Sequence, residues 1–491
     1  MLLGRDRELA ALNAYYQGDF RFKIEIVEGR HGVGKTALCQ EFLKGKGAVA
    51  VVHPSPSPKD ALSNLSSAID AAKETLRQVS AAAAAAPANP DESPSWEQFF
   101  SLVDAIADAT GKRPVLYLDD FPALGSADPS FSKALAAALD PQRGTLRSRY
   151  AFILISASRD GLGKALTEAG IDGSLALNTN RLKIRAIGHK AALIEPASTV
   201  DELVARYGSR GGIPLRYIGK SEDMPLSTPE ATQITVAPET AEDAPTARDL
   251  ALLLADAPNP FTGFTQGELC EKLNVKPLEF KRLFNELKGM DLASSVRACW
   301  FENAERKTAV RYRLADCADA VDIRTRAGRT DNEGVASDES GLYAYQTKAE
   351  MLREWVWDAG RDGSFPFEFD EVTYWFSPDG DSVRPYGVLA ISDQTNAAVA
   401  CRILESSEPI APKEIDAFVE LAHSLPFKRI HCALVAIDAT PEGLVHAGEV
   451  RDLTLAKLSP AGFQVISNSW QLHSERYQAA MRQAAEKKAN K

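Results

Sequence analysis

Residues 22–36 read FKIEIVEGRHGVGKT, and their pattern predicts the fold of the N-terminal part of the chain. From Phe22 to Val27, apolar and charged residues alternate and the stretch ends in two apolar residues, which is typical of a buried strand. Gly29 to Thr36 then have the spacing G-x-x-x-x-G-K-T, and Ala37 to Lys44 continue in a helical pattern. Because glycines let backbone N–H groups turn toward phosphate oxygens at the start of a helix, the stretch predicts a phosphate-binding P-loop.

Two residues at the end of the P-loop have specific expected roles. Lys35 is expected to reach the β- and γ-phosphates of a nucleotide, and the Thr36 hydroxyl is expected to ligate Mg²⁺. The residues expected to bind nucleotide here are Gly29, Arg30, His31, Gly32, Val33, Gly34, Lys35, Thr36 and Ala37.

A second apolar strand, Val115 to Leu118, ends in the two acids Asp119 and Asp120. In a P-loop protein the first acid holds Mg²⁺ through water, and the second polarises the water that attacks the γ-phosphate. We therefore expect Asp119 to be a metal residue and Asp120 to be catalytic together with Lys35. A strand that simply ends in an acidic turn is the alternative.

A third strand is expected from Tyr150 to Ile155, and it ends in Ser156-Ala157-Ser158. Ser156 or Ser158 could sense the γ-phosphate, although a serine-rich turn fits the pattern equally well. Together the three strands predict an α/β fold with a parallel P-loop sheet that binds ATP and Mg²⁺.

The stretch Gly4-Arg5-Asp6-Arg7-Glu8-Leu9 resembles the G-R-x-x-E-L box of STAND-type AAA+ ATPases, and most closely the archaeal-type ATPase family. Asp119-Asp120-Phe121-Pro122 and Gly211-Gly212-Ile213-Pro214 fit the same family over roughly residues 2–220. The resemblance implies that Arg5 lies near the adenine and that Pro214 packs on or near the nucleotide. That family usually has Asp-Glu at positions 119–120, so the shorter Asp120 bears on the hydrolysis rate rather than on nucleotide binding.

Composition shifts divide the chain into three blocks. We expect an ATPase domain over 1–220 with an insertion at about 80–95, a second domain over 246–316 and a third over 342–470. Residues 221–245 and 317–341 are polar and lack an apolar period, so they are expected to be linkers. Residues 471–491 are expected to form a helical basic tail.

The middle block has the pattern of three helices and a hairpin. Thr265 to Glu268 form a capping box, Pro277 stands at a helix start, and Phe280 to Leu287 place apolar residues on one face. Ser294 to Phe301 and Ala309 to Leu314 could pair as strands. Three helices and a hairpin predict a winged-helix domain, whose third helix could enter a DNA major groove.

The residues of this block that could contact DNA are Lys276, Lys281, Arg282, Arg306 and Lys307. Arg311 and Arg313 add to the charge of the hairpin. Over residues 248–315 there are eleven Lys and Arg against nine Asp and Glu, a net charge of +2. Because this excess is small for phosphate binding, packing on the ATPase domain and regulating it is the alternative.

The third block follows the order α-β-β-β-α-β, which is typical of restriction-endonuclease-like domains. The C-terminal region of the family that the first block resembles is of this kind. A nuclease site of that type needs acids and a lysine on its second and third strands to hold Mg²⁺. This chain has Tyr386-Gly387-Val388 and Ala400-Cys401-Arg402 there, so we expect a degenerate domain without nuclease activity.

Whole-chain composition excludes several classes of protein. The net charge of −11 argues against a globally basic nucleic-acid binder, and six isolated cysteines argue against a zinc ribbon. No run of 18 apolar residues occurs in the sequence, so no membrane partner and a cytoplasmic location are expected.

Three functions remain open from the sequence. The first is a Mg²⁺-dependent ATPase that acts as a nucleotide-driven regulatory switch. The second is an ATP-regulated DNA-binding protein or defence-related nuclease-derived factor. The third is a nucleotide-binding interaction scaffold without turnover, with a protein partner or a second copy of the chain.

Overall fold

The computed structural model describes residues 4–475 except 20, 47–48, 54–60, 80–93, 141, 143, 159–160, 172, 219–244, 328–340, 377–383 and 405–407. The chain forms two compact units, a first unit of Met1–Ile187 and a second unit of Gly188–Lys491. No helix among the described residues is long and apolar enough to cross a membrane.

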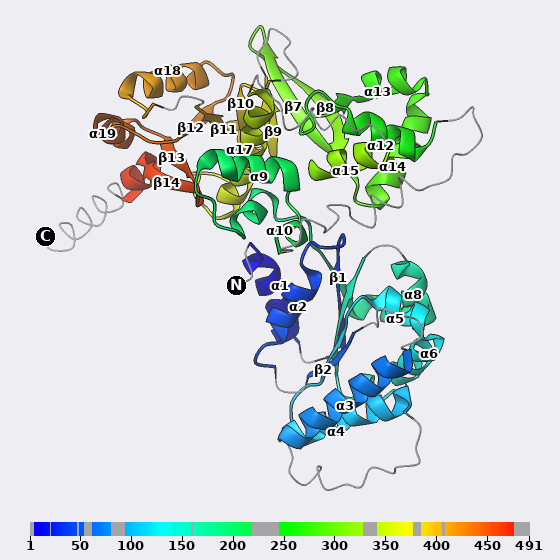
Figure 1. Cartoon of the computed structure of the whole chain (residues 1–491). Coiled ribbons are helices and arrows are strands. Elements are labelled where there is room, and N and C mark those ends of the chain that lie inside the picture. Colours follow the sequence, from blue (N-terminus) through cyan, green and yellow to red (C-terminus); the bar gives the residue numbers. More distant parts are fainter. Residues whose placement is uncertain are drawn as a thin grey trace, which may run out of the picture. The chain divides into compact units, whose positions relative to one another are not determined.

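The first unit is built on a five-stranded parallel sheet (Figure 1). Its strands are β1 (Lys23–Glu28), β2 (Val49–Val52), β3 (Val115–Leu118), β4 (Phe152–Ala157) and β5 (Thr179–Lys183). They lie in the order β2-β3-β4-β1-β5, so β4 separates the strand before the P-loop from the strand before the two acids. The parallel α/β sheet expected from the sequence is confirmed.

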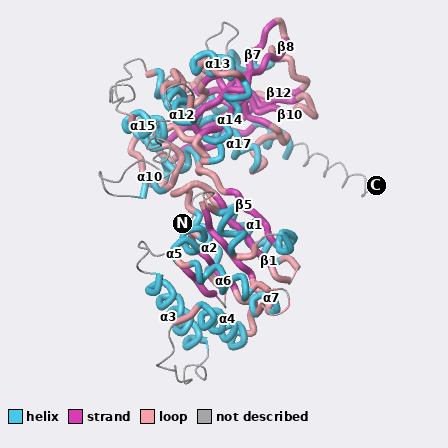
Figure 2. Tube along the Cα trace, turned by 90° about the vertical axis from the view of Figure 1, so that its right-hand side faces the viewer, coloured by secondary structure: helices cyan, strands magenta, loops and turns pink. Residues whose placement is uncertain are grey.

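Helices cover both faces of this sheet (Figure 2). Because neighbouring residues of a strand point to opposite faces, Ile24 and Ile26 enter one core and Val27 enters another. The Val27 core contains α1 (Asp6–Gln17) and α2 (Lys35–Leu43). The opposite core contains α3 (Ala61–Val79), α4 (Trp96–Thr110), α5 (Phe121–Ala127), α6 (Pro129–Ala138), α7 (Thr145–Ser148) and α8 (Leu162–Glu168), with η3 (Gly173–Asn178) before β5.

The second unit begins with a short helical segment, η4 (Gly188–Leu193), α9 (Val200–Arg210) and α10 (Leu215–Ile218). A block of three helices and a hairpin follows, as the sequence predicts: α12 (Ala247–Ala255), β6 (Phe264–Thr265), α13 (Gln266–Leu273), α14 (Pro277–Gly289), β7 (Ala293–Glu302) and β8 (Glu305–Leu314). The hairpin is longer than expected, because only Asn303 and Ala304 form its turn. Both have positive φ, 51° and 62°, as a two-residue type I′ turn requires.

The C-terminal part of the second unit has the predicted order α-β-β-β-α-β. Its elements are α17 (Leu342–Arg361), β9 (Glu371–Trp375), β10 (Gly387–Ser392), β11 (Ala397–Ile403), α18 (Pro412–His423) and β12 (Arg429–Ala436). Three further elements that the sequence did not predict then follow, α19 (Pro441–Glu449), β13 (Leu453–Ser459) and β14 (Gly462–Asn468).

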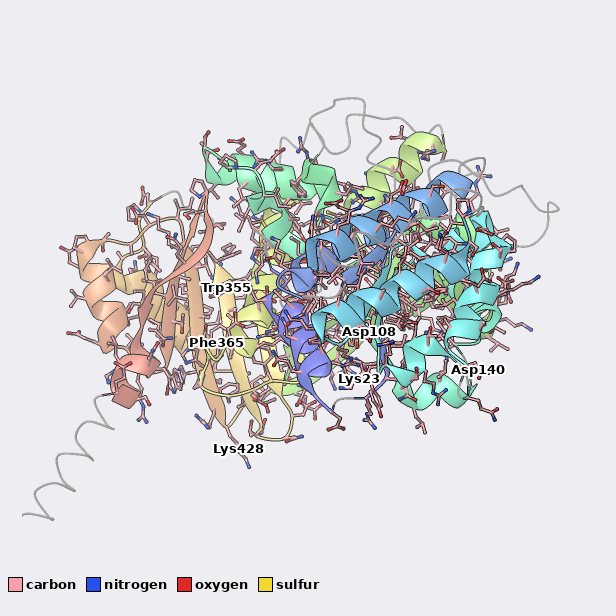
Figure 3. The ribbon with its side chains drawn as sticks, turned by 90° about the horizontal axis from the view of Figure 1, so that it is seen from below. Lys23, Asp108, Asp140, Trp355, Phe365 and Lys428 are labelled. Carbon is pink, nitrogen blue, oxygen red and sulfur yellow. The ribbon has the colours of Figure 1, made fainter. Side chains whose placement is uncertain are left out.

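The hairpin and the C-terminal strands share one nine-stranded sheet, in the order β14-β13-β12-β11-β10-β9-β7-β8-β6. Ala298 and Cys299 of β7 pair with Tyr374 and Trp375 of β9 and join the two parts. Tyr374 faces α17, whereas Trp375 enters the core that α18 covers, so the two helices lie on opposite faces. On α17, Trp355 packs edge-on against Phe365 (Figure 3).

The described elements differ from the expected boundaries in two places. Residues 188–218 belong to the second unit, whereas the sequence placed them in an ATPase domain that ends at residue 220. Residues 318–326 form the helix α15 (Ala318–Arg326) within the stretch expected to be a linker. The linker over 221–245, the insertion near 80–95 and the tail beyond 475 lie almost wholly outside the described residues.

Candidate nucleotide site

The P-loop has the backbone that its glycines were expected to allow. Gly32 and Gly34 have positive φ, 77° and 93°, and Gly34 caps the start of α2. A Cβ on Gly29 would lie 2.5 Å from the carbonyl oxygen of Ile184, which follows β5. Because positive φ and a close backbone approach both favour glycine, the sequence spacing and the local structure agree.

Two cations hold the loop in place through backbone carbonyls. The Lys35 ammonium donates to the carbonyl oxygens of Gly29 at 2.8 Å and Arg30 at 2.7 Å. The buried guanidinium of Arg5 donates to the carbonyl oxygens of Val33, at 2.7 Å, and Arg185. Arg5 therefore ties the N-terminal box to the P-loop and to the chain just after β5. Its predicted contact with adenine stays a prediction.

Asp119 is the centre of the site. Its Oδ1 accepts hydrogen bonds from the hydroxyls of Thr36 at 3.0 Å, Tyr117 at 2.7 Å and Ser156 at 2.5 Å. Its Oδ2 lies 3.1 Å from Nδ1 of His53. The structure thus brings together Thr36 and Asp119, the two residues expected to hold Mg²⁺, although they are 83 residues apart in the chain.

The two adjacent acids have different environments. Burial acts to raise the pKa of Asp119, but the hydroxyls of Ser156, Tyr117 and Thr36 outweigh it and lower that pKa. Burial raises the pKa of Asp120, and the charge of Asp119 adds to this effect, while Lys35 and His31 oppose it. Asp120 has a positive φ of 45° and caps the start of α5, so the chain turns sharply directly after Asp119.

Ser156 has a structural explanation in this arrangement. It ends β4, the strand between β1 and β3, and its hydroxyl contacts both Asp119 and the backbone N–H of Asp120, the latter at 3.1 Å. Ser158 lies two residues further and is half-exposed. Neither contact tests a role as a γ-phosphate sensor, which stays a prediction.

Sequence reasoning missed Tyr117 and His53. Tyr117 could have been found, because residues two apart on a strand share a face and Asp119 follows the same strand. His53 follows β2 as Asp119 follows β3, and neighbouring parallel strands end at the same edge of a sheet. The short apolar run Val49 to Val52 carried that signal but was not recognised as a strand.

The residues present fit a magnesium ion. A threonine hydroxyl and an aspartate carboxylate that lie together at the start of α2 are oxygen donors of the kind that Mg²⁺ prefers. Thr36 would ligate the ion directly, and Asp119 would hold it through water.

Pro214, the remaining predicted nucleotide residue, lies in the second unit between α9 and α10. The neighbouring Gly212 donates its N–H to a carboxylate oxygen of Asp316, at 2.8 Å. The nucleotide contact of Pro214 stays a prediction.

The basic residues of the helix-and-hairpin block are placed unevenly. Arg311 and Arg313, which the sequence counted toward the charge of the hairpin, are buried; Arg311 donates to Gly263 and Arg313 pairs with Glu350 at 2.8 Å. Three expected DNA contacts face acids, with Arg282 near Glu279, Arg306 near Asp393 and Lys307 near Glu305. Lys276 is exposed directly before α14, and Lys281 is exposed on that helix.

The C-terminal sheet places no acid at the two positions where a nuclease of the expected kind needs one. Ala400 of β11 is fully buried, and the guanidinium of Arg402 lies over the Tyr386 ring at 4.1 Å from its centroid. No group of three or more His, Cys, Asp or Glu that could hold a metal occurs among the described residues.

One comparison with known protein families matches most of the first unit. Residues 1–149 match a family model described as an AAA ATPase domain, so the chain carries a domain of this kind. A search of curated proteins gave no match.

Solved structures of low similarity were also found. The Aeropyrum pernix ORC2 protein in ADPNP–ADP complexes is 15% identical, with 68% of this chain and 95% of that chain covered and a TM-score of 0.37. The Aeropyrum pernix ORC1 protein in complex with DNA is 13% identical, with coverages of 67% and 93% and a TM-score of 0.30. The Drosophila ORC bound to DNA is 13% identical, with coverages of 67% and 87% and a TM-score of 0.26. Such low scores carry neither function nor partners over to this chain.

Proposed function

We propose that the chain is a Mg²⁺-dependent ATPase whose site is formed by the P-loop 29–36 and by Asp119 and Asp120. The contact between the Thr36 hydroxyl and the Asp119 carboxylate carries this proposal, because it joins the two metal residues of a P-loop site. The AAA ATPase match over residues 1–149 supports it.

Each residue has a defined role in the proposed reaction. Mg²⁺, when bound, neutralises developing charge on the β- and γ-phosphates. The N–H groups of the P-loop bind the phosphates, and Lys35 exchanges its carbonyl partners for phosphate oxygens. Asp120 orients the attacking water and accepts its proton. Arg5 holds the P-loop to the chain after β5 through its hydrogen bonds to the carbonyl oxygens of Val33 and Arg185.

The test of ATP binding is Lys35→Ala, measured by calorimetry in the presence of Mg²⁺. The wild-type chain is expected to bind ATP and the variant to lose most of that affinity, because the Lys35 ammonium is the group expected to reach the β- and γ-phosphates. Lys44→Ala is a matched control, since Lys44 is exposed on the same helical segment. Unchanged affinity in Lys35→Ala would exclude the proposed site.

We further propose that nucleotide binding acts as a switch between the two units. Arg5 supports this, because it joins the P-loop to Arg185, two residues before the boundary at Ile187. A change in the loop would therefore reach the boundary directly. Hydrogen exchange of the amides of residues 184–188 should slow or quicken on ATP binding, whereas identical exchange with and without ATP would contradict the switch.

DNA binding by a winged helix is the second candidate function, and the exposed Lys276 and Lys281 favour it. The C-terminal part is in this proposal a degenerate nuclease-like domain without activity. A gel shift at two salt concentrations tests the idea, with Lys276→Glu/Lys281→Glu expected to weaken binding and Lys112→Glu in the first unit as control. A complete lack of shift at low salt would exclude it.

A scaffold without turnover is distinguished from an ATPase by phosphate release. Release above background that depends on Asp120 supports the ATPase, whereas ATP binding without any such release supports the scaffold.

A further inference from the structure

The Asp119 carboxylate is held very differently at its two oxygens. Oδ1 accepts three hydroxyls that come from three elements: Thr36 from α2, Tyr117 from β3 and Ser156 from β4. Oδ2 has the imidazole of His53 at 3.1 Å, and that side chain is 52% exposed. One oxygen therefore accepts from three hydroxyls, of which Tyr117 and Ser156 are buried, and the other faces a ring at the surface.

With Ser156, Tyr117 is one of the two buried hydroxyl donors. Its side chain is completely buried in the core between the sheet and α2, with Leu38 and Cys39 among its neighbours in that core. Its hydroxyl is the donor of the hydrogen bond to Asp119, because an ionised carboxylate can only accept. Its nearest acceptor is Asp119 Oδ1 at 2.7 Å, whereas Ser156 Oγ lies at 3.4 Å.

Thr36 cannot remain a permanent partner of Asp119 in the proposed ATPase, because its hydroxyl is also the expected ligand of Mg²⁺. When Thr36 turns to the metal, Tyr117 and Ser156 are the donors that still hold Oδ1. The free lone pairs of the carboxylate are then those of Oδ2, on the side where the His53 ring can move aside.

We infer that Tyr117 is a positioning residue for the metal: its hydroxyl, with that of Ser156, commits Oδ1 of Asp119 to the protein and presents Oδ2 to the hydration shell of Mg²⁺. The inference rests on the proposed ATPase function. Residues that orient a metal-binding group in this way alter metal affinity when they are removed, even though they do not touch the ion.

The test is Tyr117→Phe, which removes one hydroxyl and leaves the ring in its core. Tyr374→Phe is the matched control, because the buried hydroxyl of Tyr374 donates to the carboxylate of Glu350 in the second unit. Both variants lose a buried hydroxyl bound to a carboxylate, so both should lose stability, but only Tyr117→Phe should affect the metal.

Two readouts separate metal binding from nucleotide binding. Calorimetry in a chelator measures ATP affinity without divalent ions, and electron paramagnetic resonance of Mn²⁺ measures metal affinity in the protein–ATP complex. Tyr117→Phe is expected to keep the metal-free ATP affinity and to lower the Mn²⁺ affinity by about 10-fold or more. Tyr374→Phe is expected to match the wild type in both readouts.

The possible outcomes are distinct. Unchanged Mn²⁺ affinity in a folded Tyr117→Phe variant would overturn the inference and leave the proposed ATPase intact. A wild-type chain that binds no ATP would overturn the proposed function and the inference with it. If Tyr117→Phe does not fold, Ser156→Ala removes the second lasting donor to the same oxygen and should lower Mn²⁺ affinity in the same way; an unchanged value there would equally overturn the inference.

Discussion

Asp119 and Asp120 are adjacent residues whose carboxyl pKa values move in opposite directions. Hydroxyl donors lower the pKa of Asp119, which suits a metal residue, and the raised pKa of Asp120 makes it a better proton acceptor. Pairs of acids separated in this way are a recurrent arrangement in active sites. The local structure therefore supports the division of roles that the sequence order suggested.

Replacing Asp120 by Asn should slow ATP turnover and spare ATP binding. The amide keeps the shape of the side chain but cannot accept a proton, so a loss on the order of 100-fold or more is expected. Phosphate release and calorimetry measure the two quantities separately. Asp120→Glu introduces the acid that is usual at this position in the family that the first block resembles, and it should retain activity. Equal turnover in Asp120→Asn and the wild type would contradict the role of Asp120 as proton acceptor.

Glu25 makes stability depend on pH. It lies buried in β1, where burial raises its pKa from 4.5 to about 7, although Asn180 donates to both of its oxygens and opposes the shift. The unfolded chain releases this proton near pH 4.5, whereas the folded chain keeps it until about pH 7. The unfolded state therefore binds fewer protons in this range, and the free energy of unfolding falls as the pH rises through it.

Glu25→Gln should remove this dependence. The variant is expected to be more stable than the wild type at pH 8 by roughly 2–3 kcal/mol and close to it at pH 4. Urea unfolding of the full chain at both pH values measures the difference. A variant that is equally destabilised at both would show that the carboxyl group serves packing rather than titration.

At the scale of the element, α17 is the helix that holds the second unit together. Glu350, Glu354 and Asp358 are spaced by four residues and so lie on one side of the helix. Glu350 contacts Arg313 of β8, Arg353 and Tyr374 of β9. Glu354 accepts from the N–H of His189 and the hydroxyl of Tyr207, and Asp358 pairs with Lys190. One helix thus binds the hairpin, the sheet and the segment after residue 187.

Removal of Glu350 should be costly. Burial would raise its pKa, but the guanidinium groups of Arg313 and Arg353 lower it well below the usual range, so the group is ionised. Glu350→Ala removes the carboxylate that pairs with the buried Arg313 and the half-buried Arg353, and a loss of about 3–5 kcal/mol is expected. Asp358→Ala on the same helix is the control, since a part-exposed pair contributes less than about 1 kcal/mol. Denaturant midpoints measure the stability of both variants. Similar losses of stability in the two variants would contradict the prediction that the buried pair contributes more.

The sequence predicted those elements whose signal is local. The P-loop, the apolar runs of β1, β3 and β4, and the capped helices of the middle block were found from spacing alone. β5 was missed because its residues TNRLK are polar at an exposed sheet edge, where the apolar pattern of a buried parallel strand fails. The polarity of the stretch after residue 316 predicts a linker, yet Asp316 and Asp319 are buried, because Arg216 neutralises them.

At the scale of the whole molecule, the three blocks expected from composition become two compact units. The pairing of β7 with β9 joins residues that lie about 75 positions apart, and the sequence of neither strand indicates which strand it pairs with. The approach of Thr36 to Asp119 could be predicted because P-loop residues have a fixed spacing and chemistry. The partners of the hairpin could not, because sheet register across such a distance depends on tertiary packing.

The second unit should fold with residues 188–218 and lose stability without them. Arg216 pairs with Asp316 at 2.6 Å and Asp319 at 2.8 Å, all three side chains being buried, and Tyr207 donates to Glu354. A fragment of residues 245–475 removes Arg216 from both carboxylates, and breaking a buried ion pair in this way costs about 3–5 kcal/mol.

A fragment of residues 188–475 should therefore unfold cooperatively in urea, and 245–475 should unfold at a much lower midpoint or aggregate. Asp316→Asn/Asp319→Asn in the shorter fragment should recover part of the loss, because neutral side chains are less costly to bury without a partner. Equal midpoints for the two fragments would instead place residues 188–218 with the ATPase domain, as the sequence alone suggested.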